Sequence, residues 1–296
     1  MNTSETISIV TVCDNHFVSM LAALLKSIEI THVSGEKVDI YIVADGISKN
    51  NKSKLIDSLT TGKLNLIWMT MDEAIPKDLK LPADNTTFPM SVYVRICIPY
   101  FIPQDATRVI FLDVDMILLE DISKLWHTDI GDYAIAAAID RAGTVDSPWG
   151  GILNYKALGF DPKSKYFNAG MQIIKPKLWR ELDIPKKIFK CAEDNFAYLN
   201  FADQYCLNVV FNANWFELSP LWNCHTANDI KSPYLIHFIG IKPIYQGYNL
   251  NKDYKDLFFY YLNQTKWAGM KPQSDSIRMI KKAYNKFVKK LPALFR

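Results

Sequence analysis

Residues 108–118 read Arg108-Val109-Ile110-Phe111-Leu112-Asp113-Val114-Asp115-Met116-Ile117-Leu118. The apolar run at the start is typical of a strand buried on both faces. Asp113 and Asp115 interrupt it, and because side chains alternate along a strand, both carboxylates should point the same way. Neighbouring carboxylates repel and are costly to bury, whereas a divalent cation offsets both effects. The stretch therefore predicts a cation site beyond the end of a central strand.

An Asp-x-Asp pair alone is weak evidence for a cation site. With 23 Asp among 296 residues, about two such pairs are expected by chance. The alternative is a strand that ends in a solvated acidic turn. Other segments of the chain must therefore decide between the two interpretations.

Composition excludes several classes of protein. A hydrophobic content of 49% and an aromatic content of 13% argue against disorder. The net charge of +3 is too small to indicate nucleic-acid binding. Five scattered cysteines without a Cys-x-x-Cys pair exclude a zinc ribbon and favour reduced thiols in a cytosolic compartment. We also expect no signal peptide and no apolar run long enough to span a membrane.

Alternating patterns in the first quarter of the chain predict a parallel sheet with right-handed crossovers. Period-2 or β-branched runs indicate three strands, and period-3.6 runs indicate two helices between them. The strands are expected at 7–13, 38–44 and 64–71, and the helices at 16–31 and 48–59. Asp14 and Asn15 should end the first strand and cap the helix after it.

Later segments bring further polar residues to the ends of apolar elements. Their expected elements are a loop at 72–88, a helix at 90–100, a strand at 133–140, a loop at 141–165, a strand at 171–174, helices at 185–199 and 203–211, and a strand at 234–239. Arg95, among apolar neighbours, should either pair with an acidic residue or reach a phosphate. Asp203 could be a helix cap, and His237 could be a core histidine or a ligand.

The end of the chain has a different composition. From Ile277 on, apolar residues at helical spacing form one stripe, and basic residues fill the rest of the helix. Such a basic amphipathic helix is typical of binding to an anionic membrane surface. The alternative is an ordinary helix that packs its stripe on the core.

Six stretches together resemble the family 8 glycosyltransferases, the retaining enzymes that include bacterial lipopolysaccharide galactosyl- and glucosyltransferases and glycogenin. The matching stretches, in the family's order, are residues 12–15, 93–95, 111–115, 167–170, 202–204 and 237–240. The resemblance implies a GT-A type nucleotide-diphospho-sugar transferase fold, α/β with a mixed central sheet flanked by helices. It would form a catalytic domain over 1–245, followed by a basic helical extension over 246–296.

The resemblance also implies a role for each matching residue. A divalent metal, manganese or magnesium, would be held by Asp113, Asp115 and His237, and the nitrogen ligand favours manganese. The UDP-sugar donor would be contacted by Thr11, Cys13, Asn15, His16, Arg95, Val114, Asn168, Ala169, Gly240 and Lys242. The catalytic residues would be Asp140, Asp203 and Gln204. Two departures from the family pattern are Cys13, where some members have Asp, and a loop one residue shorter before Lys242.

The implied reaction moves glucose or galactose from a UDP-sugar to a glycan or lipid-linked acceptor at the inner face of a membrane, as in lipopolysaccharide biosynthesis. Retention of configuration favours same-face attack; among protein nucleophiles, Asp203 is chemically better than the neutral amide of Gln204. One alternative is a sugar-1-phosphate nucleotidyltransferase, but residues 13–16 lack the glycine and lysine that would hold a triphosphate. A second is a non-catalytic sugar-binding protein, although the set of metal ligands is complete.

Overall fold

The computed structural model describes residues 6–82, 84–227 and 230–294, with side chains to residue 288. The described chain forms two compact units, each assembled from separate segments. Unit 1 comprises the residues up to Met71, Val109–Asp129 and Ser219–Ile277. Unit 2 comprises Asp72–Arg108, Ile130–Leu218 and the residues from Arg278 on. The prediction of a catalytic domain over 1–245 and an extension over 246–296 stays a prediction.

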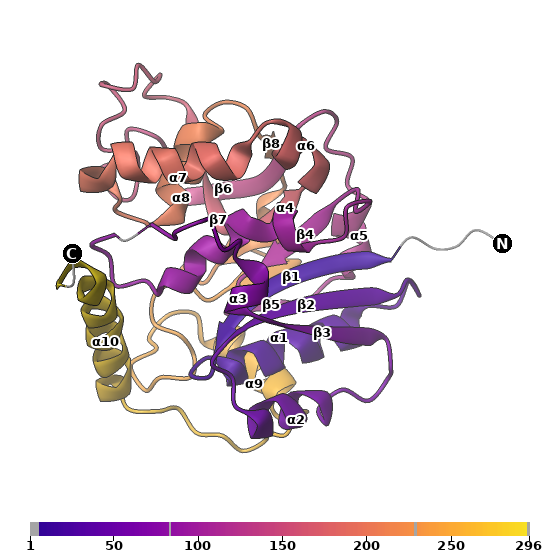
Figure 1. The fold of residues 1–296 in the computed structure, drawn as a ribbon. Helices are drawn as coiled ribbons and strands as arrows, with labels where there is room; N and C mark the ends of the chain where they lie inside the picture. Colours follow the sequence, from indigo (N-terminus) through magenta and orange to yellow (C-terminus); the bar gives the residue numbers. More distant parts are fainter. Residues whose placement is uncertain (1–5, 83, 228–229, 295–296) are drawn as a thin grey trace. The chain divides into compact units, whose positions relative to one another are not determined.

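Unit 1 contains the predicted parallel strands, with neighbours in the order β3-β2-β1-β4. Its strands are β1 (Ile7–Asp14), β2 (Val38–Asp45), β3 (Leu64–Thr70) and β4 (Val109–Leu112), and its first helices are α1 (Val18–Thr31) and α2 (Lys49–Ile56). Figure 1 shows β1, β2 and β3 as adjacent arrows, with α2 below them. The first five predicted elements are therefore confirmed, because each pattern is set by residues close together in the chain.

The central stretch is not one strand, as we expected, but two. β4 ends at Leu112, and β5 (Met116–Leu118) belongs to a second sheet of order β5-β10-β9, with β9 at Cys224–His225 and β10 at Leu235–His237. The reason is that β5 pairs antiparallel with β10, so the chain must leave the first sheet after Leu112. Asp113 and Asp115 lie in the bend between the two strands, not on one strand face.

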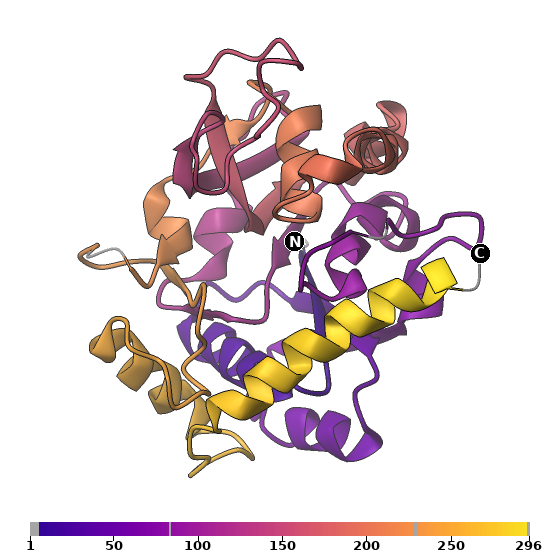
Figure 2. The same cartoon turned by 90° about the vertical axis from the view of Figure 1, so that its left-hand side faces the viewer.

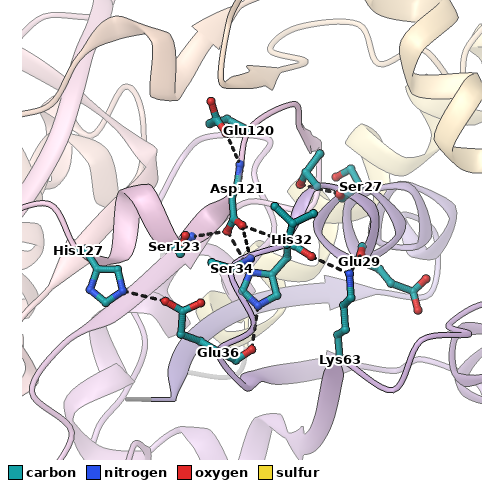
Figure 3. Close-up of polar contacts among 12 residues, drawn as sticks. Ser27, Glu29, His32, Ser34, Glu36, Lys63, Glu120, Asp121, Ser123 and His127 are labelled. Atoms are coloured by element: carbon teal, nitrogen blue, oxygen red, sulfur yellow. Dashed lines mark hydrogen bonds and ion pairs between the residues drawn. The ribbon is translucent and has the colours of Figure 1, made fainter. Parts of the chain in front are cut away.

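Polar contacts join α1 and the turn after it to β5 and to the segment that follows β5. Figure 3 shows the contacts around Asp121. The Ser27 hydroxyl of α1 accepts a hydrogen bond of 2.9 Å from the Leu118 N–H. Asp121, which caps α5 (Ile122–Trp126), accepts hydrogen bonds from the N–H groups of Val33, Ser34 and Ser123 and lies 3.0 Å from His32 Nδ1. Burial raises the pKa of this carboxyl, but the hydrogen bonds outweigh burial and hold the pKa well below its usual range.

Unit 2 contains three strands in the order β7-β6-β8, where β6 is Ile135–Thr144, β7 is Lys165–Ile174 and β8 is Phe216–Glu217. β6 and β7 pair antiparallel, with irregularities after Ala137 and Ile139. Both strands extend further than we predicted, because this pairing continues past the polar residues that we read as strand ends. Asp140 therefore lies within β6, and Asn168 lies within β7.

The predicted helix at 90–100 is a 3₁₀ helix, η1 (Met90–Cys97), followed by α4 (Ile98–Phe101). Pro99 accounts for the last turn of η1, because it has no N–H to bond the Arg95 carbonyl four residues earlier. The Ile98 N–H donates to that carbonyl instead, which is the 3₁₀ pattern. Arg95 is thus held on a tighter helix, in a buried position.

The remaining helices complete the two units. They are α3 (Met71–Ala74), α6 (Pro176–Glu181), α7 (Ile184–Asp194), η2 (Phe196–Tyr198), α8 (Asp203–Val210), η3 (Pro220–Asn223), α9 (Lys252–Leu262) and α10 (Asp275–Leu294). Figure 2 shows α10 as one unbroken helix. Among the described residues, no helix is both long enough and apolar enough to cross a membrane. The sheet contains both parallel and antiparallel pairs of strands, so the predicted α/β fold with a mixed sheet is confirmed.

Candidate functional site

Three predicted metal ligands come together in unit 1. Asp113, Asp115 and His237 each offer a ligand atom, and these atoms lie within 4.8 Å of one another. The pairing of β5 with β10 produces this arrangement, because it places Met116 opposite His237 and so brings Asp115 beside the imidazole. The Phe238 N–H also donates to the Asp115 carbonyl at 2.8 Å. We call these three residues the metal group.

The orientation of the imidazole suits a metal ligand. His237 Nδ1 lies 3.0 Å from the Asn223 side-chain oxygen, and Nε2 lies 3.2 Å from Asp115 Oδ1. An amide oxygen can only accept, so Nδ1 carries a proton, and Nε2 is the nitrogen that would coordinate a metal. Asn223 was not predicted as a site residue, since nothing in the sequence around it indicates a contact with residue 237.

Lys242 reaches the metal group despite the shorter loop. Its ammonium forms an ion pair with Asp115 Oδ2 and donates to the Phe238 carbonyl at 2.7 Å. Gly240 makes the turn possible, since its φ of +77° is rarely adopted by other residues. Burial raises the pKa of Asp115, but the charges of Lys242 and His237 outweigh it and hold the pKa well below its usual range.

This donor set fits a divalent ion. Two carboxylates and one imidazole supply oxygen and nitrogen ligands, and both Asp115 and His237 are buried. Lys242 balances the charge of Asp115 in the structure, so a bound cation would relieve the same electrostatic penalty. The arrangement is consistent with the predicted cation site and excludes a simple solvated acidic turn.

The segment from Thr11 to Phe17, predicted to contact the nucleotide, is the end of β1 and the turn before α1. Asp14 Oδ1 accepts hydrogen bonds from the His16 and Phe17 N–H groups in the turn before α1. The predicted cap by Asp14 or Asn15 is wrong, because the N-cap of α1 is Phe17, which makes no side-chain cap hydrogen bond. His16 Nε2 lies 2.5 Å from the hydroxyl of Tyr245, and the two rings stack with centroids 6.0 Å apart.

The other predicted nucleotide contacts differ in accessibility. Asn15 is exposed and accepts hydrogen bonds at the start of α2, from the Ser48 N–H and the Asn51 amide. Thr11 and Cys13 are buried, and burial raises the pKa of the Cys13 thiol well above its usual range. A neutral, buried thiol cannot pair with a base as a carboxylate would. Any base contact from position 13 would therefore come from its backbone.

Unit 2 brings together the residues predicted to hold the sugar. The Asn168 amide donates to Asp140 Oδ2 at 2.8 Å, and Gln204 Oε1 accepts from the Ala169 N–H at 3.0 Å. Gln204 Nε2 lies 3.4 Å from the same Asp140 oxygen. We call these residues, with Arg95 and Asp203, the polar cluster. They come from η1, β6, β7 and α8.

Arg95 pairs with an acidic residue, which was one of the two predicted alternatives. Its Nε lies 2.8 Å from Asp203 Oδ2, and its guanidinium also donates to the Ala169 carbonyl. Arg95 and Asp203 are both buried. Just before Asp203, Ala202 has φ 49° and ψ −124°, a conformation that residues with side chains rarely adopt. This conformation directs the chain into α8 and positions Asp203 and Gln204.

Two residues of unit 2 that were not predicted as site residues, Tyr166 and Asn208, make contacts that position Gln204. Tyr166 lies 3.5 Å from Gln204 Nε2, and burial with the charges of Asp140 and Asp203 raises its pKa well above its usual range. Asn208 bonds both the N–H and the carbonyl of Phe167 and the Gln204 carbonyl. Its spacing of four residues from Gln204 on one helix face could have indicated the role of Asn208.

Comparison with known sequences identifies the family. A sequence model described as Glycosyl transferase family 8 matches residues 8–243, which is most of the chain. The chain belongs to glycosyltransferase family 8. The metal group and the polar cluster lie within the matched range. Of the helices and strands, α9 and α10 lie outside it.

Curated relatives match the chain at low sequence identity, and several of them are named glycosyltransferases. General stress protein A of Bacillus subtilis is 28% identical over 90% of this chain and 96% of its own length. Glycosyltransferase GlyB of Streptococcus pneumoniae is 23% identical over 94% of this chain and 66% of its own length. Two further streptococcal relatives are much longer, since the matches span 24% and 58% of them.

Solved structures show the same fold. The galactosyltransferase LgtC, solved with donor and acceptor sugar analogues, matches with a TM-score of 0.72 at 22% identity, covering 89% of this chain and all of that one. The bifunctional glycosyltransferase WbbM matches with a TM-score of 0.73 at 21% identity, covering 89% of this chain and half of that one. The predicted GT-A fold of this family 8 glycosyltransferase is therefore confirmed.

Proposed function

We propose that the chain transfers a hexose, glucose or galactose, from a UDP-sugar to a glycan or lipid-linked saccharide, with retention of configuration. The observation that supports this most directly is the metal group, whose three ligand atoms lie within 4.8 Å of one another. In this proposal the metal group binds the nucleotide diphosphate, and the polar cluster binds the sugar.

Manganese is the ion that we propose for the metal group, since one imidazole beside two carboxylates favours it over magnesium or calcium. When bound, such an ion supplies Lewis-acid stabilisation of the negative charge that develops on a departing diphosphate. The protein's own contribution is to orient His237 through Asn223 and to keep Lys242 beside Asp115. Lys242 can then donate to a phosphate oxygen, which adds a second positive charge where negative charge develops.

The polar cluster suits recognition of sugar hydroxyls. Asp140 offers acceptors, and the amides of Asn168 and Gln204 can both donate and accept. These side chains hold one another by hydrogen bonds of 2.8 to 3.4 Å, so their positions are set before a ligand binds. Preorganised groups of this kind bind with a smaller loss of entropy.

Same-face attack by the acceptor accounts best for retention. Asp203 would be the stronger nucleophile, but its carboxylate is buried and paired with Arg95. Gln204 carries a neutral amide, which is a poor nucleophile. We therefore propose that the departing phosphate oxygen accepts the proton of the acceptor hydroxyl as the new glycosidic bond forms. Asp203 and Arg95 then position Ala169 and Gln204 around the sugar.

The test is UDP release from a panel of UDP-sugars, measured with manganese, magnesium, calcium or a chelator. We expect manganese-dependent UDP release from UDP-glucose or UDP-galactose, and none with the chelator. A nucleotidyltransferase would instead form UDP-sugar from UTP and sugar-1-phosphate. A non-catalytic protein would bind UDP-sugars without releasing UDP. Either of these results would overturn the proposal.

We also propose that α10 binds an anionic membrane surface, which would place the protein at the cytoplasmic face. The side chains of Ile280, Tyr284 and Phe287 are 59 to 69% exposed along one stripe of the helix. Positions 278, 281 and 285 are half-buried instead, and the Asn285 amide donates to the Thr87 carbonyl. The apolar stripe thus faces away from the packed side, which an ordinary surface helix would not do.

Vesicle co-sedimentation tests this second proposal. The wild-type protein should bind vesicles that contain anionic lipid and lose this binding in high salt. Changing Ile280 and Phe287 together to Ser should abolish binding, while changing the equally exposed Tyr260 of α9 to Ser should not. Equal vesicle binding by the wild type and both variants would refute the proposal that α10 binds the membrane surface.

A further inference from the structure

Unit 2 displays an exposed aromatic cluster formed by three separate segments. The rings of Trp149 and Phe201 have centroids 5.6 Å apart, and those of Phe201 and Phe88 are 6.3 Å apart. The Arg141 guanidinium lies 4.9 Å from the centre of the Trp149 ring. Trp149 is 47% exposed and Phe88 is 41% exposed. We call these four residues the aromatic platform.

The backbone around Trp149 is built to hold this ring in place. Gly150 has φ +81°, which favours glycine, and a Cβ atom there would lie 3.1 Å from the Phe201 ring, a tight contact for a larger residue. The Ser147 hydroxyl donates to the Trp149 carbonyl at 3.0 Å. The Asn200 amide donates to the Gly151 carbonyl at 3.0 Å and joins this loop to the segment that carries Phe201.

Two residues of the aromatic platform lie on the same backbone segments as residues of the polar cluster. The Gln204 N–H donates to the Phe201 carbonyl at 3.1 Å, in the turn that begins α8. Arg141 directly follows Asp140, and the Ala142 N–H donates to Asp140 Oδ1 at 2.9 Å. Two of the four platform residues are therefore positioned by the same backbone segments as Asp140 and Gln204. The aromatic platform and the polar cluster both belong to unit 2.

We propose that the aromatic platform binds the saccharide acceptor, by stacking a sugar ring on Trp149 and Phe201. The face of an aromatic ring carries negative charge, and the C–H bonds on one face of a pyranose ring carry partial positive charge. Arg141 holds the Trp149 ring by a cation–π contact and can donate to a sugar hydroxyl. This inference rests on the proposed transferase function, because it assigns the acceptor to a surface beside the proposed donor-sugar residues.

The experiment uses an array of immobilised neutral and acidic saccharides, probed with the full chain in the presence of UDP and manganese. We expect wild-type protein to bind at least one saccharide, and Trp149→Ala and Phe201→Leu to weaken that binding at least about tenfold. Trp149→Phe should keep most of the binding, since it keeps an aromatic face. The control is Phe196→Ala, because Phe196 is a similarly exposed aromatic residue of unit 2 outside the aromatic platform. It should bind as the wild type does.

A kinetic measurement separates this inference from the proposed function. With the saccharide that binds, Trp149→Ala should raise the acceptor KM at least about tenfold and change the donor KM little. Unfolding by urea, followed by circular dichroism, shows whether each variant is folded. If wild-type protein hydrolyses UDP-hexose but Trp149→Ala and Phe201→Leu bind saccharide normally, or no saccharide binds at all, the inference is wrong. If wild-type protein neither hydrolyses nor transfers, the proposed function itself fails.

Discussion

The metal group and the polar cluster contrast in how their charges are balanced. In the metal group, two carboxylates meet an imidazole and the ammonium of Lys242, so charge balance depends on a cation. In the polar cluster, Asp140 is held by neutral amides, and the one buried charge pair is Arg95 with Asp203. The first site can therefore hold a positively charged ligand, as we propose, and we expect the second to keep its arrangement without one. Removing a metal ligand and removing an amide should have different consequences.

The largest effect should follow from Asp115→Asn. This change keeps the size of the side chain but removes the charge that faces His237 and Lys242. We expect UDP release to fall at least about a thousandfold, because the charge on the departing diphosphate is no longer offset. Calorimetric titration should show no manganese binding. The control Asp256→Asn lies on the exposed surface of α9 and should behave as the wild type.

Gln204→Ala tests the polar cluster in the same assays. The Ala169 N–H loses its acceptor, and Asn168 loses one contact. We expect kcat to fall about 100-fold, because the sugar is misplaced. The manganese Kd should stay within about twofold of the wild type. Loss of manganese binding in this variant would contradict the contrast between the two sites. The exposed residue Gln264 provides the matched control, Gln264→Ala.

Asn223→Leu should weaken the metal group without removing a ligand. The imidazole of His237 loses the acceptor that orients it. Loss of such a partner costs about 10- to 100-fold in metal affinity. Activity should therefore recover at high manganese concentration, unlike that of Asp115→Asn. Equal manganese affinity in the variant and in the control Asn214→Leu, an exposed position, would show that Asn223 has no such role.

Asp121→Ala should have the smallest effect on transfer, because Asp121 joins the turn after α1 to the start of α5 and belongs to neither site. We expect the free energy of unfolding at pH 7 to fall by about 2 kcal/mol, since buried N–H donors lose their acceptor. The pKa of Asp121 is lowered in the folded state, so its stabilisation is complete above about pH 4, the unfolded value. It is lost as pH falls through the lower folded pKa.

Urea unfolding between pH 2 and pH 8 checks this prediction. The difference in stability between wild type and Asp121→Ala should be constant at neutral pH and shrink below about pH 4. A difference that grew on acidification would refute the assigned direction of the pKa shift. Asp256→Ala is the control, because its exposed ion pair with Lys252 contributes little.

The first five elements of unit 1 could be predicted from the sequence, because each of these strands and helices has a local hydrophobic periodicity. The split of residues 108–118 could not, since it depends on pairing with β10, far along the chain. The same long-range pairing brings His237 to Asp115, so the ligand was predicted from family resemblance and not from pattern. The contacts of Asn223 and Tyr166 could not be predicted from the sequence, because a single polar residue beside apolar ones has many possible partners.

Ala202 has a consequence for sequence variation. Its φ of 49° with ψ −124° lies where a β-branched side chain would clash with its own backbone. Among natural or laboratory-evolved variants, position 202 should accept glycine and exclude valine, isoleucine and threonine. Its side chain is also buried, which leaves no space for a larger residue. Position 202 should thus tolerate fewer amino acids than most alanine positions do, although its methyl group takes no part in the chemistry.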